Sequence, residues 1–237
     1  MRCRWCGQFY REALSWSEIF GVKERDLLCG KCRQSLTFIS GEICRVCGRM
    51  RELTDPVYFQ QEICVDCLRW EEDENWRNEF FQNRSLYVYN EAMKQFMIRF
   101  KFRGDAAFAD LIKFDWKRFW RKHDANELVV PIPLSEERLY ERGFNQSLIL
   151  AQMLTDDPAD LLIRPHPIEK QSKKTRKERV NSGQQRFELK DEAAVKDKEI
   201  VLIDDIYTTG TTVRNAAKTL YQHGARRVRS LTLARAV

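Results

Sequence analysis

The chain has no long hydrophobic run and very few histidines. Its longest apolar stretch is far shorter than the ~20 residues that a transmembrane helix needs, which argues against a membrane span. The three histidines, His123, His166 and His223, show no metal-ligand spacing and lie in no serine or cysteine nucleophile pattern, so we assign them no role. The length of 237 residues suits one medium α/β domain with a small additional module.

Cysteine is absent after residue 67, and all eight cysteines lie before that point in four Cys-x-x-Cys pairs. No apolar signal peptide precedes them, which argues against a secreted disulfide framework and favours a cytoplasmic protein. Thiolates at this spacing fit two corners of a tetrahedron around Zn²⁺, so four pairs predict two four-cysteine zinc sites rather than a redox role. Because sulfur takes every position, both zinc ions are expected to be structural.

The pairing of the cysteines stays open at this stage. The spacing C-x2-C-x16-C-x2-C of the last two pairs is typical of a zinc ribbon. A cross-braced arrangement would use the same cysteines in a different order. Sequential pairing predicts one site with Cys3, Cys6, Cys29 and Cys32 and a second with Cys44, Cys47, Cys64 and Cys67.

The order of apolar patterns predicts three parts. We expect a tandem zinc-ribbon module over residues 1–70, an acidic linker over 71–85 and an α/β domain over 86–237. In the last part strand and helix patterns alternate, which is typical of a mainly parallel sheet flanked by helices. Strands are expected at 86–89, 127–132, 160–163, 199–204 and 227–234, and helices at 91–102, 107–122, 145–155 and 211–223.

The segment VLIDDIYTTGTT, residues 201–212, is the most informative in the chain. An apolar strand ends in Asp204 and Asp205, and in an open α/β sheet this places both carboxylates at the edge where ligands bind. Carboxylates suit the ribose 2′- and 3′-hydroxyls, directly or through Mg²⁺. An ordinary strand end and helix cap is the alternative, but the gapless pattern favours a site. The hydroxyl and amide groups that suit a 5′-phosphate belong to Thr208, Thr209, Gly210, Thr211 and Thr212.

A second segment, VVPIP at residues 129–133, predicts a short strand closed by proline. The basic turn SEERLYERGFNQS follows it, and Arg138, Arg142 and Gly143 precede an amphipathic helix there. Because guanidinium groups bind phosphate oxygens bidentately, this turn is a candidate pyrophosphate loop. A turn that only caps the helix is the alternative.

Two basic segments are candidates for contact with phosphate groups, in keeping with a net charge of +6. Residues 169–187 are poor in apolar side chains, so we predict a mobile basic arm that closes over pyrophosphate or contacts nucleic acid, with a solvated loop as the alternative. In RFKFRGD, residues 99–105, we favour a helix end with buried aromatic and solvent-facing basic residues over a base-stacking surface. The central residues of the arm are Lys173, Lys174, Arg176 and Lys177.

These motifs together resemble a known family. VLIDDIYTTGTT resembles the phosphoribosyl-pyrophosphate (PRPP) signature of type I phosphoribosyltransferases, which implies that Asp204 and Asp205 bind the ribose and residues 208–212 the 5′-phosphate. With the cysteine pairs, KFRGD, VPIPLS, RGFNQ and QSKKTRKERVNS, nearly the whole chain is similar to the ComF family. The resemblance implies a type I phosphoribosyltransferase-like fold and a part in the uptake of transforming DNA.

The resemblance further implies a place at the inner face of the membrane, beside a ComFA-like ATPase that translocates DNA. It establishes no reaction, so two functions remain. The first is a competence protein that binds PRPP with Mg²⁺ and single-stranded DNA. The second is an active phosphoribosyltransferase whose acceptor the sequence does not identify, in which Arg138 and Arg142 would hold the departing pyrophosphate.

Overall fold

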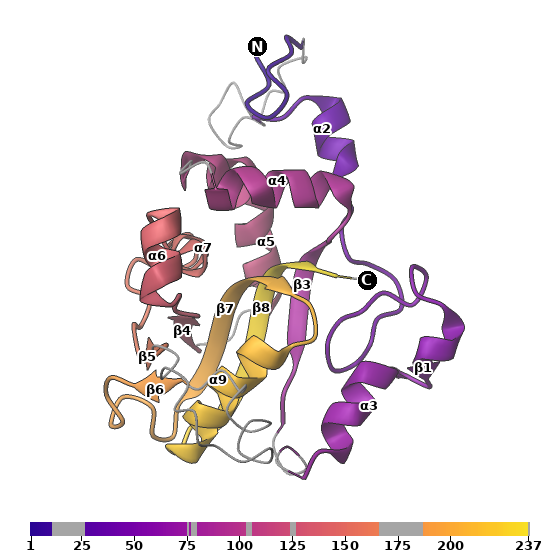
Figure 1. Ribbon diagram of the computed structural model, residues 1–237. Helices are drawn as coiled ribbons and strands as arrows, with labels where there is room; N and C mark the ends of the chain where they lie inside the picture. The colour runs from indigo at the N-terminus through magenta and orange to yellow at the C-terminus, as the bar shows by residue number, and fades with distance from the viewer. Residues whose placement is uncertain are drawn as a thin grey trace, which may run out of the picture.

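A four-stranded parallel sheet forms the centre of the molecule. The computed structural model describes residues 1–10, 27–74, 76, 80–102, 106–123, 127–165 and 187–236 (Figure 1). The strands lie in the order β3-β8-β7-β4, and each neighbouring pair is parallel. This confirms the predicted α/β class with a parallel sheet. The strands are β3 (Asn83–Val88), β4 (Leu128–Pro131), β7 (Glu199–Tyr207) and β8 (Arg227–Arg235).

Each face of the sheet has its own hydrophobic core. Side chains alternate along a strand, so Val201 and Ile203 of β7 enter one core while Ile200 and Leu202 enter the other. The helix α9 (Thr211–Gln222) covers the second face (Figure 1). The first face is covered by α4 (Glu91–Phe102), α5 (Lys113–His123) and α7 (Gln146–Gln152).

The amino-terminal cysteine segments each contribute to one of these cores. The first, with α2 (Gly30–Ser35), buries Cys3 and Leu28 in the core to which α4 contributes. The second buries all four of its cysteines in the core that α9 covers. The chain between the two runs beside β3, where the amide of Ile39 donates to the carbonyl of Leu86 at 3.0 Å. The elements of the second segment are η1 (Pro56–Tyr58), β1 (Phe59–Gln60), β2 (Ile63–Cys64) and α3 (Val65–Glu72).

The predicted helix over residues 107–122 is replaced by two elements. The 3₁₀ helix η2 (Ala106–Ile112) precedes α5. In η2 the buried pairs Phe108 with Leu111 and Ala109 with Ile112 are each three residues apart, which is the period of a 3₁₀ helix. Asp115 in α5, which interrupts the apolar pattern, accepts a hydrogen bond from the Tyr87 hydroxyl at 2.6 Å and so faces a polar partner.

The predicted basic turn after the VVPIP strand is wrong, because residues there form the helix α6 (Glu136–Arg142). The Ser135 hydroxyl caps its start by accepting from the amide of Arg138 at 3.4 Å. Gly143 ends the helix with a φ of 76°. A capping serine, acidic first turn and terminal glycine are ordinary helix signals, so this helix was readable from the sequence.

Other bounds also differ from the prediction. The expected strand at 160–163 is outside the parallel sheet, because β5 (Leu162–Ile163) pairs antiparallel with β6 (Glu188–Leu189). Sequence analysis missed β6. The strand β3 begins at Asn83, inside the expected linker range. Among the helices of the described residues, none combines the length and apolar character needed to cross a bilayer.

Candidate functional site

The carboxyl end of β7 carries both predicted carboxylates. Asp204 is half-buried and Asp205 is buried. Asp204 accepts hydrogen bonds from the Ser147 hydroxyl at 3.0 Å and from the backbone amide of Asp205 at 2.9 Å. Burial and the charge of Asp205 raise the pKa of Asp204 to about 7, although the amide, Lys101 and Ser147 favour its ionised form. A cation placed here would therefore be stabilised by the ionised pair.

Lys101 adds a positive charge that sequence reasoning missed. Its Nζ lies 2.5 Å from Oδ2 of Asp205, and the two side chains are only 15% and 12% exposed. We predicted that the basic residues of this helix end face solvent, and for Lys101 and half-buried Arg99 that prediction is wrong. The guanidinium of Arg99 packs 4.7 Å from the ring centre of Phe108. Phe100 is buried, as predicted.

The threonine-glycine loop joins β7 to α9. Thr208 and Thr209 are exposed, and the hydroxyl groups of Thr209 and Thr211 are hydrogen-bonded at 2.9 Å. Gly210 has a φ of 85°, and a Cβ there would overlap the buried hydroxyl of Tyr207, so the position requires glycine. Gly210 is also the N-cap and has no side chain to cap the first turn of α9, whose Thr211 amide donates to the hydroxyl of Thr209 at 3.5 Å. Such a helix start suits a phosphate.

Three arginines interact electrostatically near the carboxyl end of β7. Arg138 and Arg142 lie on α6, and Arg164 follows β5. Burial and the positive charges of Arg138 and Arg142 lower the pKa of Arg164, whereas Asp204 raises it. The four groups are therefore close enough to interact electrostatically. Arg142 also donates to the side chain of buried Gln146 at 2.8 Å. Arg164 was missed, since an arginine after LLI has no distinctive sequence signal.

The second cysteine segment contacts the loop directly. The indole Nε1 of Trp70 donates to the carbonyl of Thr209 at 3.1 Å. Arg235 at the end of β8 donates to Sγ of Cys47 at 3.0 Å and to its carbonyl at 3.2 Å. The guanidinium of Arg235 also lies 5.0 Å from the ring centre of Tyr207, the residue beneath Gly210. A metal-ligand cysteine is thus linked to the loop through two side chains.

Arg214 of α9 joins the helix to the same segment. It is buried, and its guanidinium lies 4.9 Å, 5.5 Å and 4.8 Å from the ring centres of Trp70, Trp76 and Phe81. Cation–π contacts of this kind stabilise the buried guanidinium, whose Nε and Nη2 have no hydrogen-bond partner among the described residues. Trp70 and Trp76 therefore pack against α9 as well as within the core that contains the second cysteine group.

The eight cysteines form two groups, and the sequential pairing is correct. Within each group the four sulfur atoms lie within 4.8 Å of one another. The amides of Cys29 and Cys64 each donate to a sulfur, Sγ of Cys3 and of Cys44, at 3.3 Å, as suits thiolates. Four sulfurs fit tetrahedral Zn²⁺ and leave no position for water, so both sites are structural. The groups are Cys3, Cys6, Cys29 and Cys32, and Cys44, Cys47, Cys64 and Cys67.

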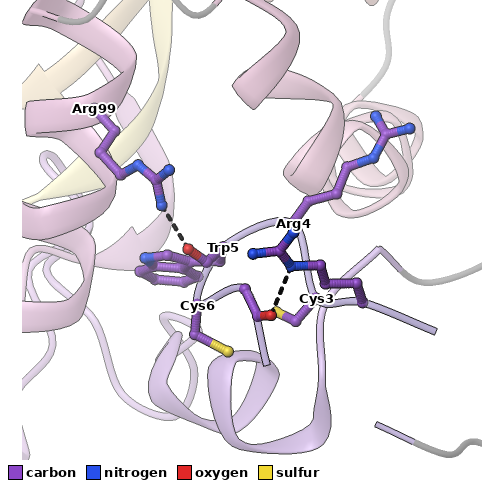
Figure 2. Close-up of a pocket in the computed structure, with 7 residues that line it drawn as sticks. Cys3, Arg4, Trp5, Cys6 and Arg99 are labelled. Carbon is purple, nitrogen blue, oxygen red and sulfur yellow. Dashed lines mark hydrogen bonds between the residues drawn. The ribbon is translucent and has the colours of Figure 1, made fainter. Parts of the chain in front are cut away.

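A cavity of about 700 Å³ lies beside the first group (Figure 2). Arg99 reaches it from α4 and donates to the carbonyl of Trp5 (Figure 2), while Arg2 donates to the carbonyl of Gly7 at 2.9 Å. Three guanidinium groups make the cavity electropositive. Its lining residues are Arg2, Cys3, Arg4, Trp5, Cys6, Gly7 and Arg99.

Apart from Phe187 at its end, the predicted basic arm lies outside the described residues. This applies to all four of its central residues, Lys173, Lys174, Arg176 and Lys177.

Comparison with known proteins assigns a domain type to both ends of the chain. Residues 1–68 match the double zinc ribbon domain, and residues 161–236 match the phosphoribosyl transferase domain. Competence protein ComFC of Bacillus subtilis is 39% identical, over 98% of this chain and 94% of that protein. Competence protein ComFC of Streptococcus pneumoniae is 32% identical, over 99% of this chain and 100% of that protein. DNA utilization protein YhgH of Escherichia coli O157:H7 is 26% identical, over 88% of this chain and 96% of that protein.

One solved structure is a distant match. It is described as the allosteric regulatory enzyme of purine biosynthesis and is 16% identical in sequence. The match has a TM-score of 0.35 and covers 51% of this chain and 25% of the matched chain. A likeness at that level carries no argument.

The raised pKa of Asp204 predicts a pH-dependent stability. Between its ordinary value of 3.8 and about 7 the folded chain holds a proton that the unfolded chain has lost, so the contribution of Asp204 to stability falls as pH rises through this range. Asp204→Asn should therefore gain stability relative to the wild type as pH rises, by about 1 kcal/mol or more between about pH 5 and about pH 8. Urea denaturation measures this difference. Asp157→Asn, at an exposed position, is the control. If the difference in unfolding free energy between Asp204→Asn and the wild type does not change with pH, the raised pKa of Asp204 is contradicted.

The two cysteine groups predict two phases of zinc release. The first group includes the exposed Cys6, whereas every cysteine of the second is buried. We expect two Zn²⁺ per chain, and a chromophoric chelator should remove the ion of the first group faster. Cys6→Ser should abolish the fast phase and leave one ion bound. Release of both ions in a single phase would contradict this difference in protection.

Proposed function

Because this chain belongs to the ComFC family of competence proteins, we propose that it acts in DNA uptake during natural transformation. We propose further that its phosphoribosyltransferase-type domain binds PRPP together with Mg²⁺. The observation that supports this most is the convergence of a carboxylate pair, a threonine-glycine loop and an arginine cluster at one end of the sheet.

Each part of PRPP has a matching group at this site. Asp204 and Asp205 offer carboxylate oxygens, the ligands that Mg²⁺ prefers, and can also accept hydrogen bonds from ribose hydroxyls. Residues 208–212 would hold the 5′-phosphate at the start of α9. Arg138, Arg142 and Arg164 would hold the pyrophosphate, since guanidinium groups pair with phosphate oxygens.

An active phosphoribosyltransferase is the second candidate function. This function is favoured because the chain has both groups that the reaction would need, the carboxylate pair and the arginines. An acceptor would attack C1 of the ribose while pyrophosphate leaves toward the arginines, which stabilise its negative charge. Acceptor choice would lie outside the loop that binds the ribose phosphate.

Single-stranded DNA is the proposed macromolecular ligand. The electropositive cavity at the first zinc ribbon and the basic arm offer guanidinium and ammonium groups for DNA phosphates. We place the protein in the cytoplasm, because eight cysteines serving as zinc ligands require a reducing compartment. A ComFA-like ATPase at the inner face of the membrane is the proposed partner in DNA transport.

Calorimetric titration tests the PRPP site. Intact protein should bind PRPP in the presence of Mg²⁺, and the double variant Asp204→Asn with Asp205→Asn should lose this binding because its side chains no longer carry the charge that holds the cation. Asp157→Asn should bind as the wild type does. Zinc content checks that each variant is folded. Intact protein that shows no binding would refute the ligand assignment.

A salt titration tests the basic arm as a DNA contact. The logarithm of the binding constant for single-stranded DNA falls with the logarithm of salt concentration by about 0.7 for each neutralised phosphate. Substituting Lys173, Lys174, Arg176 and Lys177 with glutamine should therefore reduce the slope by up to about 3. If the slope is unchanged, the arm makes no phosphate contact. Arg4→Gln, in the cavity of the first ribbon, shows whether that surface contributes separately.

A further inference from the structure

The ion pair between Lys101 and Asp205 lies inside the proposed ligand site, yet its two residues come from distant parts of the chain. Lys101 is in the last turn of α4, and Asp205 is near the end of β7. Their charged atoms are 2.5 Å apart, and both side chains are mostly buried. An ion pair in this position is too well shielded to be an ordinary surface contact.

The partners of the two carboxylates differ in charge. Within the described part of the chain, the hydrogen-bond donors to Asp204 are both neutral, the hydroxyl of Ser147 and a backbone amide. Asp205 has the ammonium group of Lys101. Among the residues that the structure describes, Lys101 is the cation at ion-pair distance from these two adjacent carboxylates. The pair keeps a net negative charge when both are ionised, and a divalent cation would neutralise it.

We propose that Lys101 is the resident counter-ion of Asp205 and that a divalent cation binds to this carboxylate by displacing it. The identity of the cation as Mg²⁺ rests on the proposed function. A lysine is suited to exchange, because its charge is compact and sits at the end of a flexible four-carbon stem. An arginine in the same place would hold the carboxylate in a bidentate pair.

Displacement gives Lys101 a second partner. When the cation arrives with an anionic ligand, the released ammonium group can contact a phosphate oxygen of that ligand. When the cation binds alone, the ion pair between Lys101 and Asp205 breaks and the ammonium group gains no phosphate contact. Mg²⁺ and the phosphorylated ligand should therefore each increase the affinity of the other, and Lys101 is the residue that couples them.

The charge of Lys101 is tested by calorimetry with Mg²⁺ alone. Lys101→Met keeps the apolar stem and removes the charge, so it should bind Mg²⁺ about tenfold or more tightly than the wild type does. Adding PRPP should then improve Mg²⁺ affinity less in this variant than in the wild type. Lys94→Met is the matched control, because Lys94 lies exposed on the same helix and pairs with Glu91 at 3.4 Å. Equal Mg²⁺ affinities in Lys101→Met and the wild type would overturn the proposal.

The unmodified protein allows a second test that needs no variant. Acetic anhydride reacts with accessible amines, and mass spectrometry reports the acetylation of each lysine. Lys101 should be protected without Mg²⁺ and become reactive at saturating Mg²⁺, while Lys94 reacts equally in both conditions. If Mg²⁺ leaves the reactivity of Lys101 unchanged, the cation does not displace it and the proposal is wrong.

These outcomes separate the proposal from the proposed function. Tighter Mg²⁺ binding by Lys101→Met, without PRPP binding to any form of the protein, would support the counter-ion role and reject the PRPP site. PRPP binding by the wild type, with equal Mg²⁺ affinity in both forms, would support the PRPP site and reject the counter-ion role.

Discussion

Two adjacent carboxylates at the end of a buried strand are the constraint on which this site depends. Burial raises the pKa of Asp204, and the adjacent charge of Asp205 raises it further. The fold compensates with Lys101 from α4, Ser147 from α7 and the backbone amide of Asp205. Under the proposed function, a divalent cation would relieve the remaining repulsion, so the property that costs stability would also favour cation binding.

The zinc ribbons are part of the architecture around this site. The indole of Trp70 in the second ribbon donates to the loop carbonyl of Thr209. The same ribbon contacts Arg214 of α9, which follows the loop, and Arg235 of β8. Because the sulfur of Cys47 is one of those contacts, loss of zinc from the second group would disturb the surroundings of the threonine-glycine loop without changing its residues. The metal therefore contributes to the shape of the site and supplies no chemistry of its own.

Much of this organisation was predictable from the sequence, because its signals are local. The spacing of the cysteines, the apolar strand before Asp204 and the helix after Gly210 all depend on neighbouring residues. The α6 helix was missed although Ser135 and Gly143 mark its ends. Lys101 and Arg164 could not be found in this way, since their roles arise only when α4 and β5 reach the end of β7. The same applies to Arg214, whose aromatic partners come from the zinc-ribbon side of the chain.

A crystal structure of the protein grown with PRPP and Mg²⁺ tests the central claim most directly. The account predicts the 5′-phosphate at residues 208–212, the cation bonded to the carboxylates of Asp204 and Asp205, and the ammonium group of Lys101 moved off Asp205 toward a phosphate oxygen. PRPP bound elsewhere, or a ligand at the loop with the Lys101 ion pair intact and no cation on the carboxylates, would contradict it.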